Sequence, residues 1–239
     1  MQKGRLLYEG KAKKLFETEQ ENVLMVEYLD QATALNGLKK DEIVGKGQLN
    51  NQITSLIFKE LSAKGIETHF IKKISKDEQL VEKVKMFPLE VVVRNVAAGS
   101  FTKRLGISEG SQLAFPIVEF YFKEDRLDDP FINEQQILVL SLATEAEILQ
   151  MKKIALQVNK ALQELFLAVD ICLVDFKIEF GKTKTGKVLL ADEISPDTCR
   201  LWDRSSQAHL DKDVYRREIG DLVPVYQEVC NRLEKRRDQ

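Results

Sequence analysis

The sequence predicts a fold of the α+β class, in which strands joined by tight turns are combined with helices. Residues 174–180 alternate strictly between apolar and charged side chains, and a second apolar run follows a Gly-containing turn at 188–191. Strict alternation marks a strand with one buried face, and two runs around a turn form a hairpin. Apolar residues with helical spacing recur within 50–63 and 144–166, as on the buried face of a helix.

Length and composition exclude several classes of protein. A chain of 239 residues, 44% of them hydrophobic, makes one large domain or two modest ones. The 36 basic and 38 acidic residues nearly balance, which argues against an electrostatic nucleic-acid binder. No apolar run approaches the roughly 18 residues of a membrane span, and the N-terminus lacks an apolar signal core. We therefore expect neither a nucleic acid nor a membrane as partner.

Cysteine and histidine usage points to a cytoplasmic chain without a zinc site. The three cysteines are odd in number and lack C-x-x-C spacing, which favours a reducing compartment. Only two histidines occur, His69 and His209, and no H-E-x-x-H motif contains them. We expect both histidines to be structural.

The first predicted hairpin places a basic turn between apolar runs at 6–8 and 15–16. Gly10 lets the backbone approach a ligand closely. Lys11 and Lys13 face the same way on an extended segment, so they could bind one polyphosphate together. A solvated basic turn is the commoner explanation for such a segment on a protein surface.

The next elements alternate between strands and helices. A strand at 23–28 precedes a long, mobile connection at 30–48, since this stretch contains three glycines and scattered charges. Further strands are predicted at 69–74, 79–85 and 117–123, and helices at 50–63, 214–219 and 222–233. Thr144 and Glu147 have the spacing of a capping box, which predicts the start of the long helix.

Residues 86–105 contain a second group of polar residues. Pro88 interrupts strand pairing, so a hinge is predicted at 86–88. Arg94 ends the buried strand 91–93 and could bind a phosphate or carboxylate bidentately. Gly99 and Ser100 open a short helix whose backbone N–H groups suit an anion. A buried arginine that only caps the strand explains Arg94 equally well.

The acidic residues of the hairpin at 173–200 depend on its register. If paired residue numbers add to an odd value, Asp192 lies opposite Glu179 on the charged face, whereas an even value sends it to the apolar face. Two adjacent carboxylates repel unless a proton or cation lies between them. Magnesium bound by one or two carboxylates and substrate phosphates is the natural occupant. A solvated sheet face with ordinary ion pairs is the alternative.

A phosphate-loop pattern at 181–187 is misleading. Gly181-Lys-Thr-Lys-Thr-Gly186-Lys187 matches G-x-x-x-x-G-K, but Val188 follows where the motif requires Ser or Thr and then a helix. We interpret it as the turn of the hairpin.

Four segments together resemble the SAICAR synthetase (phosphoribosylaminoimidazole-succinocarboxamide synthase) family. They are GKAK at 10–13, MFPLEVVVRNVAAGS at 86–100, LVDFKIEFG at 173–181 and ADEISPDTCRLWD at 191–203. The two long segments are specific, and the similarity covers essentially the whole chain.

This resemblance implies an ATP- and Mg²⁺-dependent ligase of de novo purine biosynthesis. Such enzymes join L-aspartate to the carboxylate of carboxyaminoimidazole ribonucleotide (CAIR), giving SAICAR, ADP and phosphate. The implied fold has a small N-terminal antiparallel β domain, here 1–86, over a larger α+β domain, here 87–239. ATP lies in the cleft between them, as in protein kinases and ATP-grasp enzymes. A cytoplasmic homodimer is implied as well.

The resemblance also implies roles for individual residues. ATP binding is implied for Gly10, Lys11, Ala12, Lys13, Met86, Lys123, Glu179 and Asp192, of which Glu179 and Asp192 would also bind the metal. Ribonucleotide binding is implied for Arg94, Gly99, Ser100, Lys177, Asp197 and Arg200. Catalytic roles are implied for Lys177, Asp175 and Arg94. Cys199 is not expected to be a catalytic thiol, because no histidine base lies near it.

Two other functions fit the same residues. A small-molecule kinase on this scaffold would share the ATP half of the site but lack a pocket for an aspartate-sized amine. A non-catalytic nucleotide-binding module would not need both Glu179 and Asp192.

Overall fold

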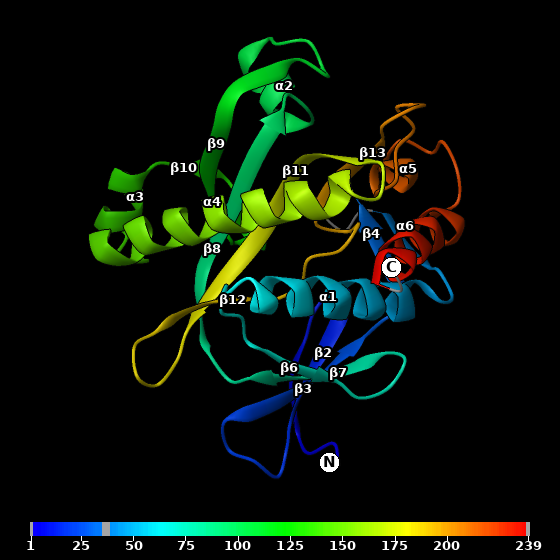
Figure 1. Ribbon diagram of the computed structural model, residues 1–239. Helices are drawn as coiled ribbons and strands as arrows, with labels where there is room; N and C mark the ends of the chain where they lie inside the picture. Colours follow the sequence, from blue (N-terminus) through cyan, green and yellow to red (C-terminus); the bar gives the residue numbers. More distant parts are fainter. Residues whose placement is uncertain (1, 35–38, 238–239) are drawn as a thin grey trace.

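Two antiparallel sheets carry the fold of this computed structural model, which describes residues 2–34 and 39–237 (Figure 1). The first sheet has the strand order β1-β2-β3-β7-β6. Its strands are β1 (Leu6–Glu9), β2 (Lys13–Glu17), β3 (Val23–Tyr28), β6 (Phe70–Lys73) and β7 (Glu78–Glu82). The hairpin predicted near the N-terminus is confirmed, since β1 pairs antiparallel with β2.

The stretch 30–48 is not the long connection that its composition predicted. In its described part, β4 (Gln31–Ala34) pairs with β5 (Lys39–Glu42), and α1 (Lys46–Ala63) already begins at Lys46. Residues 35–38 lie outside the described residues. The Asp30 carboxylate accepts hydrogen bonds from the backbone N–H groups of Gly45 and Gly47. These bonds fix the start of α1. The strand β5 was not predicted, because all its residues are polar and show no alternation with apolar ones.

The second, larger sheet has the order β10-β9-β8-β11-β12, and β13 also pairs with β11. Its strands are β8 (Lys85–Val96), β9 (Gln112–Phe122), β10 (Phe131–Ile132), β11 (Ile171–Lys182), β12 (Val188–Ala191) and β13 (Cys199–Asp203). The turn 183–187 joins β11 to β12, so the misleading phosphate-loop pattern is confirmed as a hairpin.

One edge of β11 is shared by two strands. β12 pairs with Glu179 to Lys182, whereas β13 pairs with Ile171 to Phe176. Between them the 192–198 loop leaves the sheet and returns to it. The backbone N–H of Lys177 donates to the carbonyl of Thr198 over 2.8 Å and closes the gap. The chain rejoins the sheet at Cys199, where β13 begins.

Strand β8 continues across the predicted hinge. The ladder between β8 and β11 shifts register between Glu90 and Met86, next to Pro88. The carbonyl of Pro88 still accepts a hydrogen bond from the backbone N–H of Lys123 over 3.0 Å. The proline thus disturbs pairing with one neighbour only. The division into 1–86 and 87–239 stays a prediction.

Helices cover the sheets and complete the core. In Figure 1, α4 (Glu145–Leu167) crosses the larger sheet, and α1 lies beside it, next to α6 (Leu222–Arg237). The capping box of Thr144 and Glu147 is confirmed. The remaining helices are short: α2 (Ser100–Leu105), α3 (Glu134–Val139), α5 (Asp213–Arg216) and the 3-10 helix η2 (Asp125–Leu127). Phe176, Ile178 and Phe180 of β11 are buried in the main core, as predicted. Val174 is buried instead in a separate cluster with Val96, Ala98 and Trp202.

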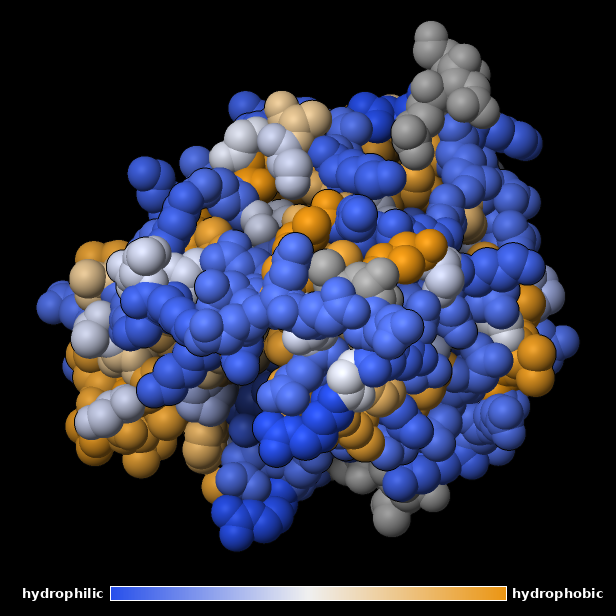
Figure 2. Space-filling model, turned by 90° about the horizontal axis from the view of Figure 1, so that it is seen from below, coloured by the Kyte–Doolittle hydropathy of each residue, from blue (hydrophilic) through white to orange (hydrophobic). Residues whose placement is uncertain are grey.

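The surface seen from the side of the first sheet is mostly hydrophilic, with hydrophobic residues gathered at its left edge (Figure 2). None of the described helices is long and apolar enough to span a membrane.

Candidate functional site

The charged face of β11 is the centre of the candidate site. Asp175 and Glu179 are only 3% and 2% exposed, so this face is not solvated. Lys177 lies between them, with its Nζ 2.7 Å from Glu179 Oε1 and 3.3 Å from Glu90 Oε1. Burial lowers the pKa of Lys177, but the carboxylates of Glu179, Glu90 and Asp192 raise it well above its usual value. The lysine is therefore a fixed positive charge.

The predicted hairpin register is wrong, although Asp192 does approach Glu179. Glu179 pairs with Ala191, which is the even register that was expected to send Asp192 to the apolar face. Asp192 follows the last residue of β12 and has a φ of 60°, in the left-handed region. Such a conformation ends the alternation of the strand, so the register no longer decides the direction of the side chain. The Asp192 carboxylate lies 3.6 Å from Lys177 Nζ and lines the same cavity as Glu179.

This cavity lies between the two sheets and has a volume of about 580 Å³. We call it the inter-sheet cavity. Its apolar wall comprises Leu15, Leu24, Val26, Val81, Val84, Met86 and Phe87. Its charged end comprises Lys13, Lys123, Glu124, Asp125, Glu179 and Asp192. An apolar wall next to convergent charges suits a flat heterocycle with a charged tail.

The two lysines at the charged end pair with acidic residues. Lys13 contacts Asp192 and lies 3.0 Å from Glu193 Oε1, while Lys123 Nζ lies 2.6 Å from Glu179 Oε2. Burial raises the pKa of Asp192, but Lys13, Lys177 and Lys123 outweigh it and hold that pKa well below its usual range. The acid is therefore ionised at neutral pH.

The predicted residues of the basic turn surround the mouth of this cavity. Lys11 Nζ reaches across to Asp125 Oδ1 over 2.7 Å. The backbone N–H of Gly10 donates to the carbonyl of Lys13, and the carbonyl of Ala12 accepts from the N–H of Leu29, both over 2.8 Å. Among these residues only Lys13 lines the cavity itself.

A second cavity, of about 270 Å³, is lined by Lys177, whose Nζ contacts Glu179 and Asp192 of the first cavity. We call it the polar cavity. Its lining includes the predicted residues Arg94, Ser100, Asp175, Lys177, Asp197 and Arg200. Glu90, Tyr121, Thr198 and Arg216 line it as well. The structure thus brings together the residues that the resemblance assigned to a ribonucleotide.

Arg94 is held on all sides by protein groups. Its Nε donates to Glu119 over 2.7 Å, its Nη1 to Asp175 over 2.8 Å, and its Nη2 to the Tyr121 hydroxyl over 3.0 Å. The same Nη2 lies 3.3 Å from the Ser100 hydroxyl. With 3% of its surface exposed, Arg94 offers a ligand little more than one edge of its guanidinium group.

Arg200 is fixed in a similar way from the other side. Its Nε donates to Asp213 over 2.9 Å and its Nη1 to Asp175 over 3.0 Å. Gly99 has a φ of 59°, and a Cβ at this position would lie 2.5 Å from Nη2 of Arg200. Gly99 is therefore required both for its conformation and for the close approach of Arg200.

Asp197 belongs to a buried cluster behind the polar cavity. Its carboxylate lies 2.6 Å from Lys46 Nζ of α1 and 3.5 Å from Lys212 Nζ, and it accepts a hydrogen bond from the Tyr226 hydroxyl of α6 over 2.5 Å. Burial raises the pKa of Asp197, but Lys46 and Lys212 lower it by more, so the pKa lies below its usual range. These contacts hold the 192–198 loop against two helices. A direct role of Asp197 toward a ribonucleotide stays a prediction.

Several residues of the site were not predicted. Glu119 and Tyr121 are polar residues two positions apart on β9, and that spacing in an otherwise apolar strand was the available signal. Arg216 lies on α5, and its Nη1 pairs with Asp213 over 2.8 Å. The sequence did not indicate a role for Lys46, because a charged residue in a glycine-rich stretch is not expected to be buried.

Cys199 lines the polar cavity but is not an activated thiol. Its side chain is buried, and this burial raises the pKa of the thiol far above its usual range. A thiol that stays protonated is a poor nucleophile, as the sequence predicted.

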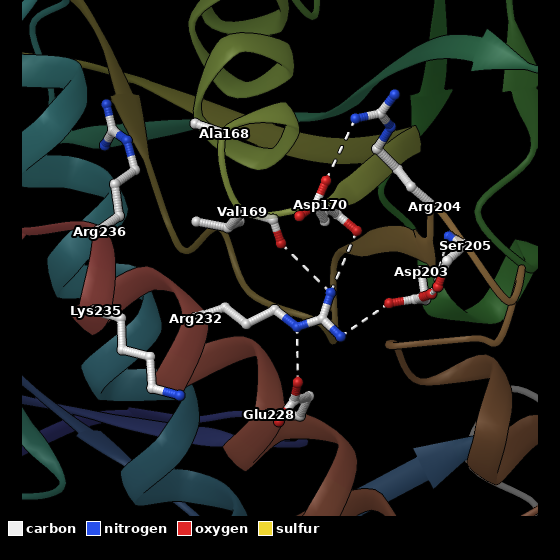
Figure 3. A pocket seen from close by; sticks show the side chains of 10 residues that line it. All are labelled: Ala168, Val169, Asp170, Asp203, Arg204, Ser205, Glu228, Arg232, Lys235 and Arg236. Atoms are coloured by element: carbon white, nitrogen blue, oxygen red, sulfur yellow. Dashed lines mark hydrogen bonds and ion pairs between the residues drawn. The ribbon is translucent and has the colours of Figure 1, made fainter.

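A larger hollow, of about 780 Å³, lies at the end of α4 and contains none of the predicted residues. Figure 3 shows that Arg232 fills its centre and points toward Glu228, Asp203 and the backbone at 169–170. The Nε of Arg232 donates to Glu228 over 2.7 Å, and its Nη2 donates to Asp203 over 2.8 Å. This arginine therefore joins α6 to the ends of α4 and β13.

Comparisons with known proteins agree with this geometry. The SAICAR synthetase family profile matches residues 6–233. The chain belongs to the SAICAR synthetase family. It is 66% identical over 233 residues to the phosphoribosylaminoimidazole-succinocarboxamide synthase of Enterococcus faecalis, covering 98% of each chain. The enzyme of the same name from Lactococcus lactis subsp. cremoris is 60% identical, over 98% of this chain and 99% of that one.

Solved structures of SAICAR synthetases have the same fold. The enzyme from Ehrlichia chaffeensis superposes with a TM-score of 0.94 at 46% identity, over 96% of this chain and 98% of that one. A SAICAR synthetase in complex with ADP superposes with a TM-score of 0.93 at 49% identity, over 96% and 97%. The predicted family and α+β fold are confirmed. The activity of this chain is that of a SAICAR synthase, an ATP-dependent ligase.

Proposed function

We propose that the chain joins L-aspartate to the carboxylate of CAIR, with ATP in the inter-sheet cavity and CAIR in the polar cavity. The observation that carries this proposal is the junction of the two cavities at Lys177. Its Nζ lies within 3.6 Å of Glu179 and Asp192 in one cavity, and the residue itself lines the other. A phosphoryl donor and a carboxylate acceptor held on the two sides of Lys177 would be adjacent.

The inter-sheet cavity suits ATP in both its parts. Met86 and the other apolar wall residues would border the adenine, and Lys13 and Lys123 would bind the phosphates. Lys11 pairs with Asp125 at the mouth through an exposed contact, so it can turn toward a bound triphosphate at little cost. A related SAICAR synthetase has been solved in complex with ADP, which supports nucleotide binding by this fold.

The polar cavity suits an anionic ribonucleotide. Arg200, Ser100 and the edge of Arg94 converge on it, and the N–H groups that follow Gly99 lie at the start of α2. Arginine binds phosphate and carboxylate through parallel hydrogen bonds. Asp175 would not contact the anion but would hold Arg94 and Arg200 in place.

The residues present fit a magnesium ion. The carboxylates of Glu179 on β11 and of Asp192 just after β12 approach the same lysine. Mg²⁺ in nucleotide sites prefers one or two carboxylates together with phosphates. When bound there, the ion would neutralise charge on the transferring phosphoryl group.

The chemistry follows from the substrate. A carboxylate is a poor acyl donor, because its leaving group would be oxide. Transfer of the γ-phosphoryl group of ATP to a carboxylate oxygen of CAIR gives an acyl phosphate and ADP. The amine of aspartate then attacks the acyl carbon, the amide bond forms, and phosphate leaves with the carboxylate oxygen. Phosphoryl transfer depends mostly on positioning and charge neutralisation, which Lys13, Lys123 and Lys177 would supply.

A coupled assay tests this function. Release of ADP by the purified chain should require CAIR, aspartate and Mg²⁺ together, and SAICAR should form in equal amount. ADP release that does not need aspartate would support the kinase alternative instead. From the family resemblance alone, we also propose a homodimer and a cytoplasmic location. Sedimentation of the purified chain would test the homodimer, and cell fractionation would test the location.

A further inference from the structure

His69 lies directly against the turn that carries Asp192. Its side chain is buried, with 6% of the residue exposed. Its Nε2 is 3.1 Å from the backbone carbonyl oxygen of Asp192. The backbone N–H of His69 donates to the carbonyl of Leu190 over 2.8 Å, and Thr68 forms a parallel bridge with Leu190. The segment before β6 thus adds to the free edge of β12 up to its last residues.

The direction of the hydrogen bond follows from the partner. A carbonyl oxygen only accepts, so Nε2 of His69 must carry the proton. An N–H of the buried ring is therefore directed at the Asp192 carbonyl.

This bond acts on the residue whose backbone is unusual. The even register of the hairpin would place the Asp192 side chain toward the core, and its φ of 60° turns it instead toward the inter-sheet cavity. A non-glycine residue keeps this conformation only when its surroundings hold it. His69 binds the carbonyl of the same residue, while Lys13 and Lys177 hold its carboxylate.

We propose that His69 is a positioning residue of the ligase site, whose Nε2–H fixes the carbonyl of Asp192 and so directs its carboxylate toward the nucleotide. The importance of Asp192 for turnover rests on the proposed function, whereas the positioning itself does not. On the side of the core, His69 packs edge-to-face with Phe58, with 5.9 Å between the ring centroids. An apolar side chain could make this packing contact, so packing alone does not require an imidazole.

The test compares two substitutions of similar length, H69Q and H69M. The Gln side chain can donate a hydrogen bond to the Asp192 carbonyl and the Met side chain cannot. We expect H69M to lower kcat about 10- to 100-fold with KM for CAIR within about twofold, and H69Q to recover most of the loss. In calorimetry, the increase in ADP affinity caused by Mg²⁺ should shrink in H69M and persist in H69Q. Equal behaviour of H69Q and H69M would overturn the proposal.

The control variant is F58L, which disturbs packing around His69 without removing its N–H. It should lower the melting temperature while leaving kcat and the effect of Mg²⁺ unchanged. Loss of activity in F58L equal to that of H69M would reduce His69 to a packing role and overturn the proposal.

A measurement on the unaltered chain keeps the test independent of folding and of the proposed function. The ¹⁵N shifts of the His69 imidazole should report a ring that is protonated at Nε2. A ring protonated at Nδ1 instead would overturn the proposal even if the chain is an active ligase. A chain without ligase turnover, but with the Nε2–H ring, would overturn the proposed function alone.

Discussion

The two adjoining cavities hold their positive charges in different ways. In the inter-sheet cavity the cations are lysines, each paired with carboxylates through a single ammonium group. In the polar cavity arginines accompany Lys177, and Arg94 and Arg200 each use separate nitrogens for separate partners. An ammonium group on a flexible stem can exchange partners, whereas a guanidinium group bound at several nitrogens cannot turn. We expect the nucleotide side to rearrange on binding and the ribonucleotide side to be preformed.

The largest effect should come from the acid that the lysines share. D192N keeps the shape of the side chain but removes the charge that pairs with Lys13 and Lys177. If Asp192 binds the metal as we propose, its loss costs several kcal/mol of transition-state stabilisation, so we expect kcat to fall by about 1,000-fold or more. Steady-state kinetics measures the fall, and circular dichroism should show an unchanged fold. A variant with near-normal rates would remove Asp192 from the nucleotide site.

Removing the most constrained arginine should damage the fold as well as binding. R94A leaves Glu119 and Asp175 buried without their cation, which costs about 3–5 kcal/mol of unfolding free energy. KM for CAIR should rise at the same time, while KM for ATP stays nearly constant. Urea unfolding and initial rates measure the two effects. An unchanged KM for CAIR would contradict the preformed polar cavity. The control is R94K, which keeps the positive charge.

The pH dependence of stability should sharpen the comparison through Asp213, which holds Arg200. Burial raises its pKa, but Arg200 and Arg216 lower it from 3.8 to about 2. Because the folded pKa lies below the unfolded one, Asp213 stabilises the fold above about pH 4. This contribution of about 2 kcal/mol is lost as the pH falls toward 2. Between pH 5 and 3, the unfolding free energy of D213N should therefore fall less than that of the unaltered chain. Parallel curves would show that the Asp213 charge does not stabilise the folded state.

The smallest effect should come from the thiol beside Arg200. Since the Cys199 thiol is buried and protonated, C199A should keep kcat and both KM values within about twofold. Iodoacetamide should not inactivate the folded enzyme through this residue, as mass spectrometry of the treated protein can check. Rapid inactivation that C199A prevents would show an accessible thiolate and a more open polar cavity.

The sequence was sufficient for elements whose pattern is local. Alternation predicted β11 and its hairpin, Thr144 and Glu147 predicted the start of α4, and Gly99 with Ser100 predicted α2. Each of these depends on neighbours within a few residues of the chain. Asp192 shows where such reasoning ends: one left-handed residue redirects a side chain without a register slip, and the apolar pattern does not record it.

Contacts between distant segments could not be predicted from spacing. Lys46 and Asp197 form a buried pair at 2.6 Å although they belong to α1 and the 192–198 loop. The residues next to Lys46 and Asp197 in the sequence do not indicate that either side chain is buried. The family resemblance brought Asp197 to attention but not its partners, because only the packed helices bring Lys46 and Tyr226 to it.

The sharing of one β11 edge by β12 and β13 limits how the chain can vary. Both ends of the 192–198 loop are fixed to the same strand, so an extra residue there can be absorbed only if β13 slides along β11. Sliding by one position would put Cys199 in the place of Arg200 and leave the Asp175 charge without that arginine. The turn at 183–187 joins β11 to β12 at the other end of the hairpin, and a longer turn there does not require either strand to slide. Insertions should therefore be tolerated in that turn and be lethal to activity in the loop.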